Sequence, residues 1–284
     1  MCRRVASEAT HETAPMSLSP NPSFDPTATS FTSLLRTVSP ELFTVGDGHA
    51  ERLVPSHVDG TTIVALIYHG GVIMAGDRRA TAGNIISKRD MRKVFAADDW
   101  SAVGISGSAG PGMELAKIMA TELEHYEKVE GAPLSLEGKA NKLAQLIRGN
   151  LPMAMQGLVV VPLFAGYDPR EQMARIYEFD AVGGRFEERR FATSGSGGRD
   201  ARGSLKARYS DGLAPERAID IAIEALWDAA DEDSATGGPD LVRGIFPLVA
   251  QIDADGYREL NDETVAERVE RIVADRRLTA NNEE

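Results

Sequence analysis

The chain has 284 residues, a hydrophobic content of 42% and a net charge of −12 at neutral pH, which suit a soluble protein with one large domain or two small ones. The acidic balance argues against a nucleic-acid partner, and no run reaches the roughly 18 apolar residues that a membrane helix needs. The single cysteine, Cys2, permits no internal disulfide and no cysteine-based metal site, and it fits a reducing, cytoplasmic setting.

Residues 1–60 differ in composition from the rest of the chain. They hold six of the fourteen prolines and many Ser and Thr residues, so they offer too little apolar surface to offset the entropy of ordering. We therefore expect most of this leader to be flexible, apart from an apolar cluster at 31–36 and 42–43. Arg3 and Arg4 resemble the start of a secretory signal, but no apolar stretch follows them, so no export signal is predicted.

The leader ends at Gly60, and an apolar strand is predicted from Thr61 or Thr62 onward. Cleavage between Gly60 and Thr61 would place a hydroxyl and a free α-amine on one residue. An α-amine titrates near ~7.7–8.0, so it can act as a base at neutral pH without a histidine. This is the activation chemistry of a hydrolase with an N-terminal threonine. The dipeptide alone favours the simpler alternative, a strand that happens to start after a glycine turn.

Two β-rich runs between residues 62 and 74 flank His69-Gly70-Gly71, which predicts a hairpin with His69 at its turn. The chain has five histidines, and those at 11, 49 and 57 lie in the leader. Neither a histidine-dependent triad nor a zinc site is therefore predicted. We expect no metal and no cofactor.

Residues 101–107 are predicted to form a short buried strand that ends in the glycine-rich turn 107–112, followed by a helix to about residue 130. Such a turn is also typical of phosphate loops, but the sequence lacks G-x-x-x-x-G-K-[ST], so nucleotide binding is not predicted. The turn instead offers an exposed backbone N–H to an oxyanion.

Hydrophobic periodicity and turn residues predict the remaining elements. In chain order these are a helix at 136–155, strands at 158–167 and 173–180, helices at 199–209 and 215–233, a last buried strand at 245–253 and a terminal helix capped by Asn261 or Asp262. Asp255-Gly256 predicts a hairpin turn after the last buried strand. Strands at both ends with helix pairs between them indicate two antiparallel sheets covered by helices.

Five motifs occur in a fixed order along the chain: Thr61-Thr62-Ile63-Val64, Gly76-Asp77-Arg78-Arg79-Ala80-Thr81, Arg92-Lys93-Val94, Ser106-Gly107-Ser108-Ala109-Gly110 and the run at 233–240. Together they resemble the β-type subunits of the 20S proteasome, most closely the actinobacterial type, over nearly all of residues 61–284. The resemblance implies an α+β fold, the four-layer αββα sandwich of the N-terminal-nucleophile hydrolase superfamily. The residue pattern alone does not distinguish that fold from other layered α+β folds.

The resemblance also implies roles for individual residues. Thr61 is the nucleophile, Lys93 stabilises its alkoxide, Asp77 holds Lys93 by a charge-assisted hydrogen bond, and the Gly107 N–H binds the oxyanion. A simple ion pair between Asp77 and Lys93 remains the alternative for those two residues.

Ser196 and Asp233 match the residues that orient the α-amine and its water in this family. Thr236 stands where the family usually has a serine, and it keeps the hydroxyl while stiffening χ1, which leaves its geometry open. A turn role remains the alternative for Ser196.

The residues that line the family's primary substrate pocket map to Ala80, Met91, Ile105, Ala109 and Met113. None of them is charged. An apolar pocket cannot pair a buried acidic or basic side chain, so mainly chymotrypsin-like cleavage is expected.

By resemblance, residues 1–60 form an autocleaved propeptide, removed at Gly60-Thr61, and residues 61–284 form the catalytic domain. The cluster at 31–36 matches the propeptide motif of actinobacterial β subunits. The implied partners are α-type subunits, other β subunits in heptameric rings and a ring-shaped ATPase that feeds in polypeptide substrates. The identity of that ATPase, and of any small protein modifier that tags the substrates, stays open. Met16 is expected to be the physiological start, because residues 1–15 have no counterpart in the resemblance.

Two alternatives to a catalytic 20S subunit fit the motifs less well. A non-catalytic β-type ring subunit typically lacks the Gly-Thr junction or the Asp77/Lys93 pair, both of which this chain retains. The simpler hexameric bacterial relative of the proteasome is shorter at its C-terminus and usually lacks the Arg78-Arg79 pair.

Overall fold

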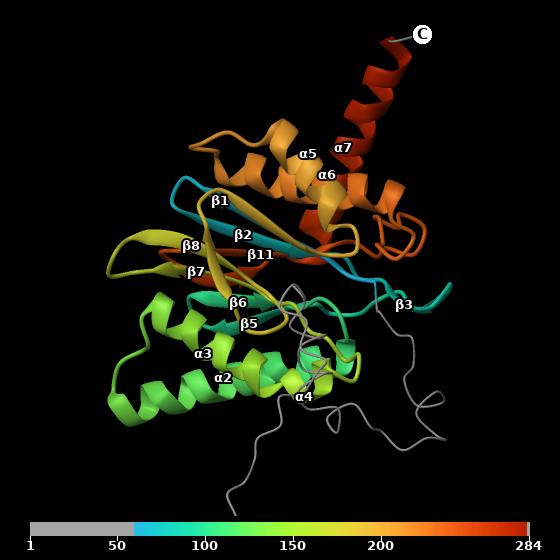
Figure 1. Cartoon of the computed structure of the whole chain (residues 1–284). Coiled ribbons are helices and arrows are strands. Elements are labelled where there is room, and N and C mark those ends of the chain that lie inside the picture. The colour runs from blue at the N-terminus through green and yellow to red at the C-terminus, as the bar shows by residue number, and fades with distance from the viewer. Residues whose placement is uncertain (1–59, 283–284) are drawn as a thin grey trace, which may run out of the picture. The chain divides into compact units, whose positions relative to one another are not determined.

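The computed structural model describes residues 60–282. Two five-stranded antiparallel sheets pack face to face, and helices cover their outer faces (Figure 1). The predictions for the leader, including its flexibility, the apolar cluster at 31–36 and the start at Met16, lie outside the described residues.

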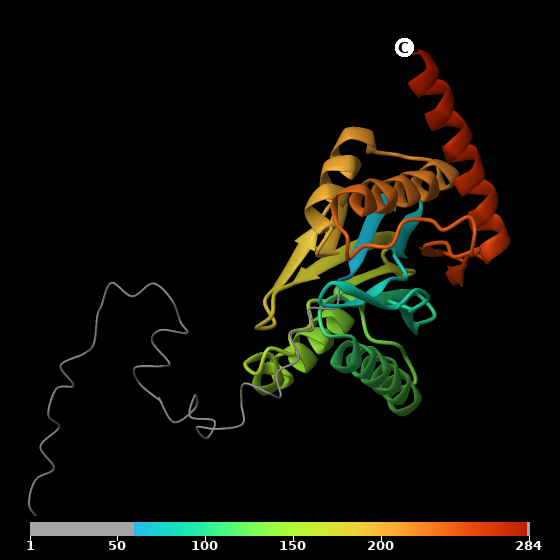
Figure 2. The same cartoon turned by 90° about the vertical axis from the view of Figure 1, so that its right-hand side faces the viewer.

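The first sheet has the strand order β10-β1-β2-β11-β12. Its strands are β1 (Thr62–Tyr68), β2 (Gly71–Gly76), β10 (Phe191–Gly195), β11 (Leu248–Asp253) and β12 (Gly256–Glu259). Helices α5 (Gly198–Arg208) and α6 (Pro215–Glu232) lie on its outer face, with α7 (Asp262–Asn282) beside α6. The far end of α7 extends beyond the sheets (Figure 2).

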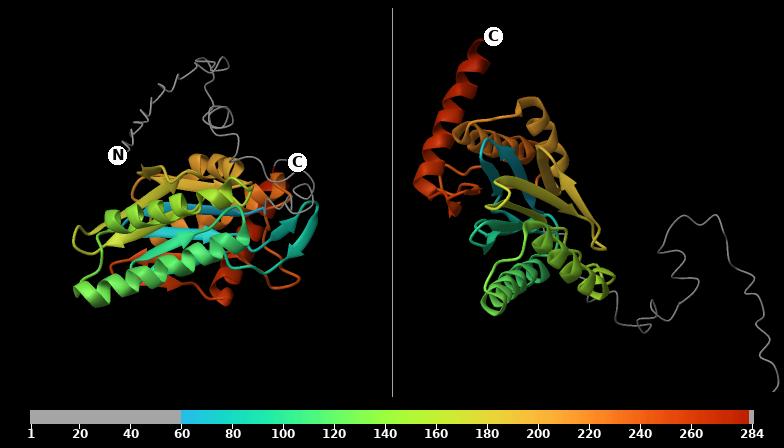
Figure 3. Two further views of the ribbon diagram at one scale, coloured as in Figure 1. Left: turned by 60° about the horizontal axis from the view of Figure 1, so that its bottom comes forward. Right: turned by 90° about the vertical axis from the view of Figure 1, so that its left-hand side faces the viewer.

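The second sheet has the strand order β5-β6-β7-β8-β9. Its strands are β5 (Val94–Asp98), β6 (Ser101–Gly104), β7 (Leu163–Asp168), β8 (Met173–Phe179) and β9 (Arg185–Glu188). Helices α2 (Ala109–Glu130) and α3 (Leu136–Gly149) lie side by side across its outer face (Figure 3). The four-layer αββα order implied by the resemblance is confirmed.

Strand β1 is buried on both faces, which explains its nearly continuous apolar sequence. Val64 and Leu66 point to the helices of the first sheet, whereas Ile63 and Ala65 point to the core between the two sheets. Because side chains alternate along a strand, one short segment contributes to both cores. Thr61 directly precedes this strand and is buried with it.

Several predicted elements are confirmed. Helix α6 begins at Pro215, and α7 begins after Asn261, whose side-chain oxygen accepts the Thr264 N–H at 2.8 Å. The turn at 255–256 joins β11 to the mostly exposed strand β12 as expected.

Four predicted bounds are wrong. The strand expected at 101–107 ends at Gly104, and the strand expected at 245–253 begins only at Leu248. The helix expected at 136–155 stops at Gly149, and a short helix, α4 (Leu151–Ala154), follows after Asn150 because Pro152 has no N–H to continue the first one. The strand expected from 158 begins only at Leu163. A small hairpin, β3 (Ala80–Ala82) with β4 (Ile85–Lys88), was not predicted.

Candidate active site

Three segments that are distant in sequence meet at one end of the two sheets. Thr61 directly precedes β1, Asp77 directly follows β2, and Lys93 directly precedes β5. Their exposed fractions are 2%, 0% and 1%. The antiparallel pairing of β1 with β2 places the start of one strand beside the end of the other, which brings Thr61 and Asp77 together.

The Asp77 carboxylate accepts a hydrogen bond from each of four donors. Its Oδ1 atom accepts the Lys93 Nζ at 2.7 Å and the Thr62 N–H at 2.8 Å. Its Oδ2 atom accepts the backbone N–H groups of Arg79 and Gly237, each at 2.9 Å. A buried carboxylate needs both a cation and hydrogen bonds to offset its desolvation, and this one has both.

The Lys93 ammonium is aimed at the junction between the leader and the domain. It donates to the carbonyl oxygen of Gly60 at 3.1 Å and to the carbonyl oxygen of Arg79, in addition to Asp77. A positive charge at this distance favours negative charge on the Gly60 carbonyl oxygen.

The Gly60-Thr61 peptide is held on both sides. The Gly60 N–H donates to Thr81 Oγ1 at 3.2 Å, and the Thr61 carbonyl oxygen accepts the Ser196 N–H at 2.9 Å. A Cβ atom at position 60 would lie 1.9 Å from the Cβ of Ala235. Only glycine therefore fits before Thr61.

A second carboxylate cluster lies at the loop after α6. Asp233 Oδ2 accepts the hydroxyls of Ser196 and Thr236, the latter at 2.6 Å, and Oδ1 accepts the Ala235 N–H at 3.0 Å. Burial raises the pKa of Asp233, but these hydrogen bonds and the nearby Lys93 charge outweigh burial and leave the pKa below its ordinary value. Asp233 is therefore ionised at neutral pH and acts only as an acceptor.

Gly107 lies in the turn between β6 and α2 with a φ of 91°. A Cβ atom there would lie 2.2 Å from the Val159 carbonyl oxygen, which the Ser108 N–H already binds at 2.8 Å. In the antiparallel bridge between Gly107 and Val160, the Ser106 carbonyl oxygen and the Ser108 N–H bond to the 159–161 segment, so the Gly107 N–H points away from that segment.

The residues predicted for the substrate pocket differ in exposure. Ala80, Met91 and Ile105 are buried, Ala109 is half-buried, and the Met113 side chain is 41% exposed.

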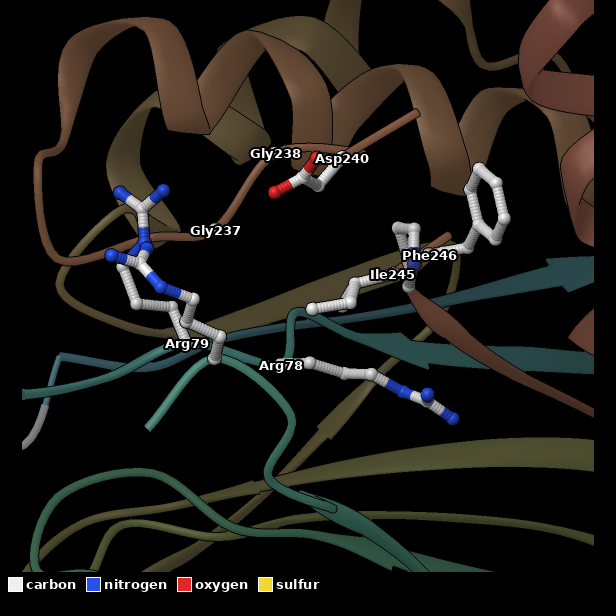
Figure 4. A pocket seen from close by; sticks show the side chains of 9 residues that line it. Arg78, Arg79, Gly237, Gly238, Asp240, Ile245 and Phe246 are labelled. Atoms are coloured by element: carbon white, nitrogen blue, oxygen red, sulfur yellow. The ribbon is translucent and has the colours of Figure 1, made fainter. Parts of the chain in front are cut away.

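A pocket beside the site is lined by residues other than those predicted for the substrate pocket (Figure 4). They are Arg78, Arg79, Arg89, Gly237, Gly238, Asp240, Ile245, Phe246 and Pro247. Since it includes none of the five residues predicted above, the apolar substrate pocket stays a prediction. The Arg79 and Gly237 backbone N–H groups that bind Asp77 come from the rim of this pocket.

Within residues 60–282, no group of three or more His, Cys, Asp or Glu side chains is arranged to hold a metal ion. Over the same range, no helix combines the length and the apolar character needed to cross a bilayer.

Residues 58–242 match the family model for proteasome subunits. The chain belongs to the proteasome subunit family. Its curated relatives named proteasome subunit beta include that of Acidothermus cellulolyticus, 52% identical over 265 residues and covering 90% of both chains. The protein of Frankia alni is 52% identical over 255 residues (90% of this chain, 93% of the relative), and that of Acidimicrobium ferrooxidans is 56% identical over 236 residues (82% and 85%).

This similarity confirms the assignment to the β subunits of the 20S proteasome made from the motifs. Proteasome subunits act as peptidases within a particle of several subunits, and the chain shares that general role. The structure brings together six of the residues that the proteasome motifs single out: Gly60, Thr61, Asp77, Lys93, Asp233 and Thr236. Ser196 joins them through its backbone N–H, which donates to the Thr61 carbonyl oxygen, and through its side chain, which donates to Asp233.

Sequence reasoning missed three members of this proteasome site. The Thr62 hydroxyl and the backbone N–H groups of Arg79 and Gly237 bond to the predicted residues. Thr62 had a detectable signal, since it is the only aliphatic hydroxyl residue within the apolar run of β1. Backbone donors carry no signal in the sequence, because every residue except proline has an N–H.

Proposed function

We propose that the chain is a threonine-type endopeptidase that removes its own leader between Gly60 and Thr61 and then uses Thr61 as an N-terminal nucleophile. The observation that supports this most directly is the position of the Gly60 carbonyl. Its oxygen lies 3.1 Å from the Lys93 ammonium, and the peptide that follows Thr61 is held by the Ser196 N–H. A cation is thus in place for the charge that develops when this carbonyl is attacked.

Self-cleavage begins with attack of the Thr61 hydroxyl oxygen on the Gly60 carbonyl carbon. The hydroxyl proton passes to the amide nitrogen as the C–N bond breaks, so the acyl group moves from nitrogen to oxygen and an ester forms. Water then hydrolyses the ester. The products are a leader that ends in the Gly60 carboxylate and a domain that begins with the free α-amine of Thr61.

Turnover of substrates repeats this chemistry in trans. The α-amine of Thr61 accepts the hydroxyl proton and returns it to the leaving amine, while the hydroxyl oxygen forms an acyl-enzyme with the substrate. Lys93 stabilises the alkoxide, and the Gly107 N–H donates to the oxyanion, a contribution worth roughly 2.7–4 kcal/mol in other hydrolases. Ser196, Asp233 and Thr236 orient the α-amine and the water that releases the product.

The same proposal extends to the assembly. Residues 1–60 act as the propeptide and residues 61–284 as the catalytic domain. The domain works in heptameric β rings, closed by α-type subunits and fed with unfolded polypeptides by a ring-shaped ATPase, in the cytoplasm.

The proposal is tested with Thr61→Ala and, as a matched variant that keeps the hydroxyl, Thr61→Ser. In the assembled wild-type particle we expect a β chain that begins at Thr61 by intact mass and N-terminal sequencing. Thr61→Ala is expected to assemble, to retain its leader and to lose peptidase activity, whereas Thr61→Ser is expected to be processed and to keep measurable turnover. Processing at another bond, or an active Thr61→Ala particle, would refute the proposal.

A further inference from the structure

We infer that Thr62 is a positioning residue that links two groups of hydrogen-bonded residues beside the nucleophile. The Asp77 cluster consists of Asp77 and its donors, and the Asp233 cluster consists of Asp233, Ser196 and Thr236. This inference rests on the proposed function, because it concerns how Thr61 is held for catalysis. Thr62 is fully buried, and it contacts the Asp77 cluster through its backbone and the Asp233 cluster through its hydroxyl.

The backbone of Thr62 is bonded to Asp77 in both directions. The Thr62 N–H donates to Asp77 Oδ1 at 2.8 Å, and the Thr62 carbonyl oxygen accepts the Asp77 N–H at 3.1 Å. Asp77 Oδ1 is also the atom that binds the Lys93 ammonium. The peptide between Thr61 and Thr62 is therefore fixed against the same carboxylate that orients the lysine.

The hydroxyl of Thr62 has a determined hydrogen-bond direction. Asp233 is an acceptor only, so Thr236 must use its single proton to bind Asp233 Oδ2 at 2.6 Å. Thr236 Oγ1 can then only accept at its 2.6 Å contact with Thr62 Oγ1, which makes the Thr62 hydroxyl the donor. Thr62 Oγ1 in turn accepts the Gly197 N–H at 3.0 Å.

This order of donors has a consequence for the α-amine of a cleaved chain. The hydroxyls of Ser196 and Thr236 both donate to Asp233, so each hydroxyl oxygen can only accept hydrogen bonds from other neighbours. An N–H group of the Thr61 amine can donate to such an oxygen and leave the nitrogen lone pair directed at the Thr61 hydroxyl. Without the Thr62 hydroxyl, Thr236 keeps its hydrogen bond to Asp233 but loses the donor that fixes its oxygen from the other side, and the Gly197 N–H loses its acceptor.

The test compares Thr62→Val, which keeps the shape and removes the hydroxyl, with Thr62→Ser, which keeps the hydroxyl. Peptidase kinetics are measured on the assembled particle and normalised to the fraction of chains that begin at Thr61. We expect Thr62→Val to lower kcat by about tenfold or more with KM within about twofold of wild type, and Thr62→Ser to restore most of kcat. Wild-type kcat in Thr62→Val would overturn the inference.

A control variant separates positioning from the general loss of a buried hydrogen bond. Ser101→Ala removes a fully buried hydroxyl that donates to Asp98 Oδ1 at 2.6 Å in the second sheet. It is expected to lower the thermal-unfolding midpoint but to leave kcat unchanged. If Ser101→Ala reduces kcat as much as Thr62→Val does, the role of Thr62 is structural only.

A double-mutant cycle tests the route through Thr236. If Thr62 acts on the site through that residue, Thr62→Val is expected to add almost nothing to the defect of Thr236→Val. Additive losses would overturn this route. If Thr62→Val does not assemble, Thr62→Cys is tested in its place, because a thiol is only a weak hydrogen-bond donor. Its kcat is expected to lie between that of Thr62→Ser and that of an inactive particle. Wild-type kcat in Thr62→Cys would then overturn the inference.

These outcomes are distinguishable from failure of the proposed function. An inactive wild-type particle or an active Thr61→Ala particle contradicts the proposed function itself. An inactive Thr61→Ala particle together with a fully active Thr62→Val particle contradicts only the role of Thr62.

Discussion

The Lys93 ammonium lies 2.7 Å from Asp77 Oδ1, and neither side chain is exposed to solvent. A buried ion pair repays its desolvation only with excellent geometry and further hydrogen bonds, so it is weak evidence for stability alone. Here three backbone N–H groups complete the coordination of Asp77, and the ammonium also reaches the Gly60 carbonyl. The arrangement is better explained by the placement of a positive charge than by a gain in stability.

Lys93→Ala is therefore expected to assemble and to lose nearly all turnover, since no other cation of the motif set can stabilise the Thr61 alkoxide. Its thermal-unfolding midpoint should fall as well, because Asp77 loses its counter-charge. Lys139→Ala is the matched control: Lys139 is also buried and paired, but its partner Asp98 lies at the opposite end of β5 from Lys93. It should reduce stability without reducing kcat. Near-normal turnover in a correctly processed Lys93→Ala particle would remove Lys93 from the mechanism.

Gly107→Ala is expected to lower kcat by about 10²–10³ while KM changes little, because the added Cβ would clash with the Val159 carbonyl and turn the N–H away from the oxyanion. Gly131→Ala provides the control. Gly131 has a φ of 71° at the end of α2 and open space around it, so this variant carries a similar backbone strain away from the site. Equal kcat in the two variants would exclude an oxyanion role for Gly107.

The lowered pKa of Asp233 predicts a pH-dependent contribution to stability. A carboxyl group whose pKa is lower in the folded state stabilises the protein above its ordinary pKa of about 3.8, and this contribution is lost as the pH falls through the lowered folded value. The thermal-unfolding midpoint of Asp233→Asn should therefore lie below that of wild type by a constant amount from pH 7 to about pH 5, and the difference should shrink below about pH 4.

Asp168→Asn distinguishes stability from catalysis in this experiment. Burial raises the pKa of Asp168, but backbone hydrogen bonds, those from Arg170 and Glu171 first among them, bring it below the ordinary value. The Asp168→Asn variant should show the same trend in stability with pH and keep its turnover, whereas Asp233→Asn should lose turnover at neutral pH. A difference between wild type and Asp233→Asn that grows on acidification would contradict the assigned shift.

Cleavage specificity follows from the uncharged side chains predicted for the substrate pocket. Fluorogenic peptides that end in Tyr or Leu should be turned over faster than peptides that end in Arg or Glu, because a buried unpaired charge costs several kcal/mol or more, whereas burial of a Leu or Phe side chain gains ~1.5–3 kcal/mol. Met113→Glu sharpens the test: Met113 is 41% exposed, so the substitution is tolerated by the fold and should raise the relative turnover of the Arg peptide. Equal turnover of all peptides by the wild-type particle would contradict an apolar pocket.

Local sequence patterns were sufficient for the elements whose signals are periodic or chemical. The apolar face of α6, the Asn261 cap of α7 and the turn at 255–256 follow from the side chains within each segment. The order and spacing of Thr61, Asp77 and Lys93 pointed to one site through the resemblance to proteasome β subunits, and in the structure each of the three lies beside a strand boundary.

The partners of these residues were decided only by the tertiary structure. Asp77 binds the N–H of Gly237, and Thr62 binds Thr236, across separations of 160 and 174 residues. Such contacts depend on how the β1–β2 pair packs beneath α6 and the loop after it, and no local propensity encodes that packing. By sequence alone Thr62 is the first residue of a β-branched strand. Its link between two carboxylates exists because the fold brings the loop at 233–237 over the start of that strand.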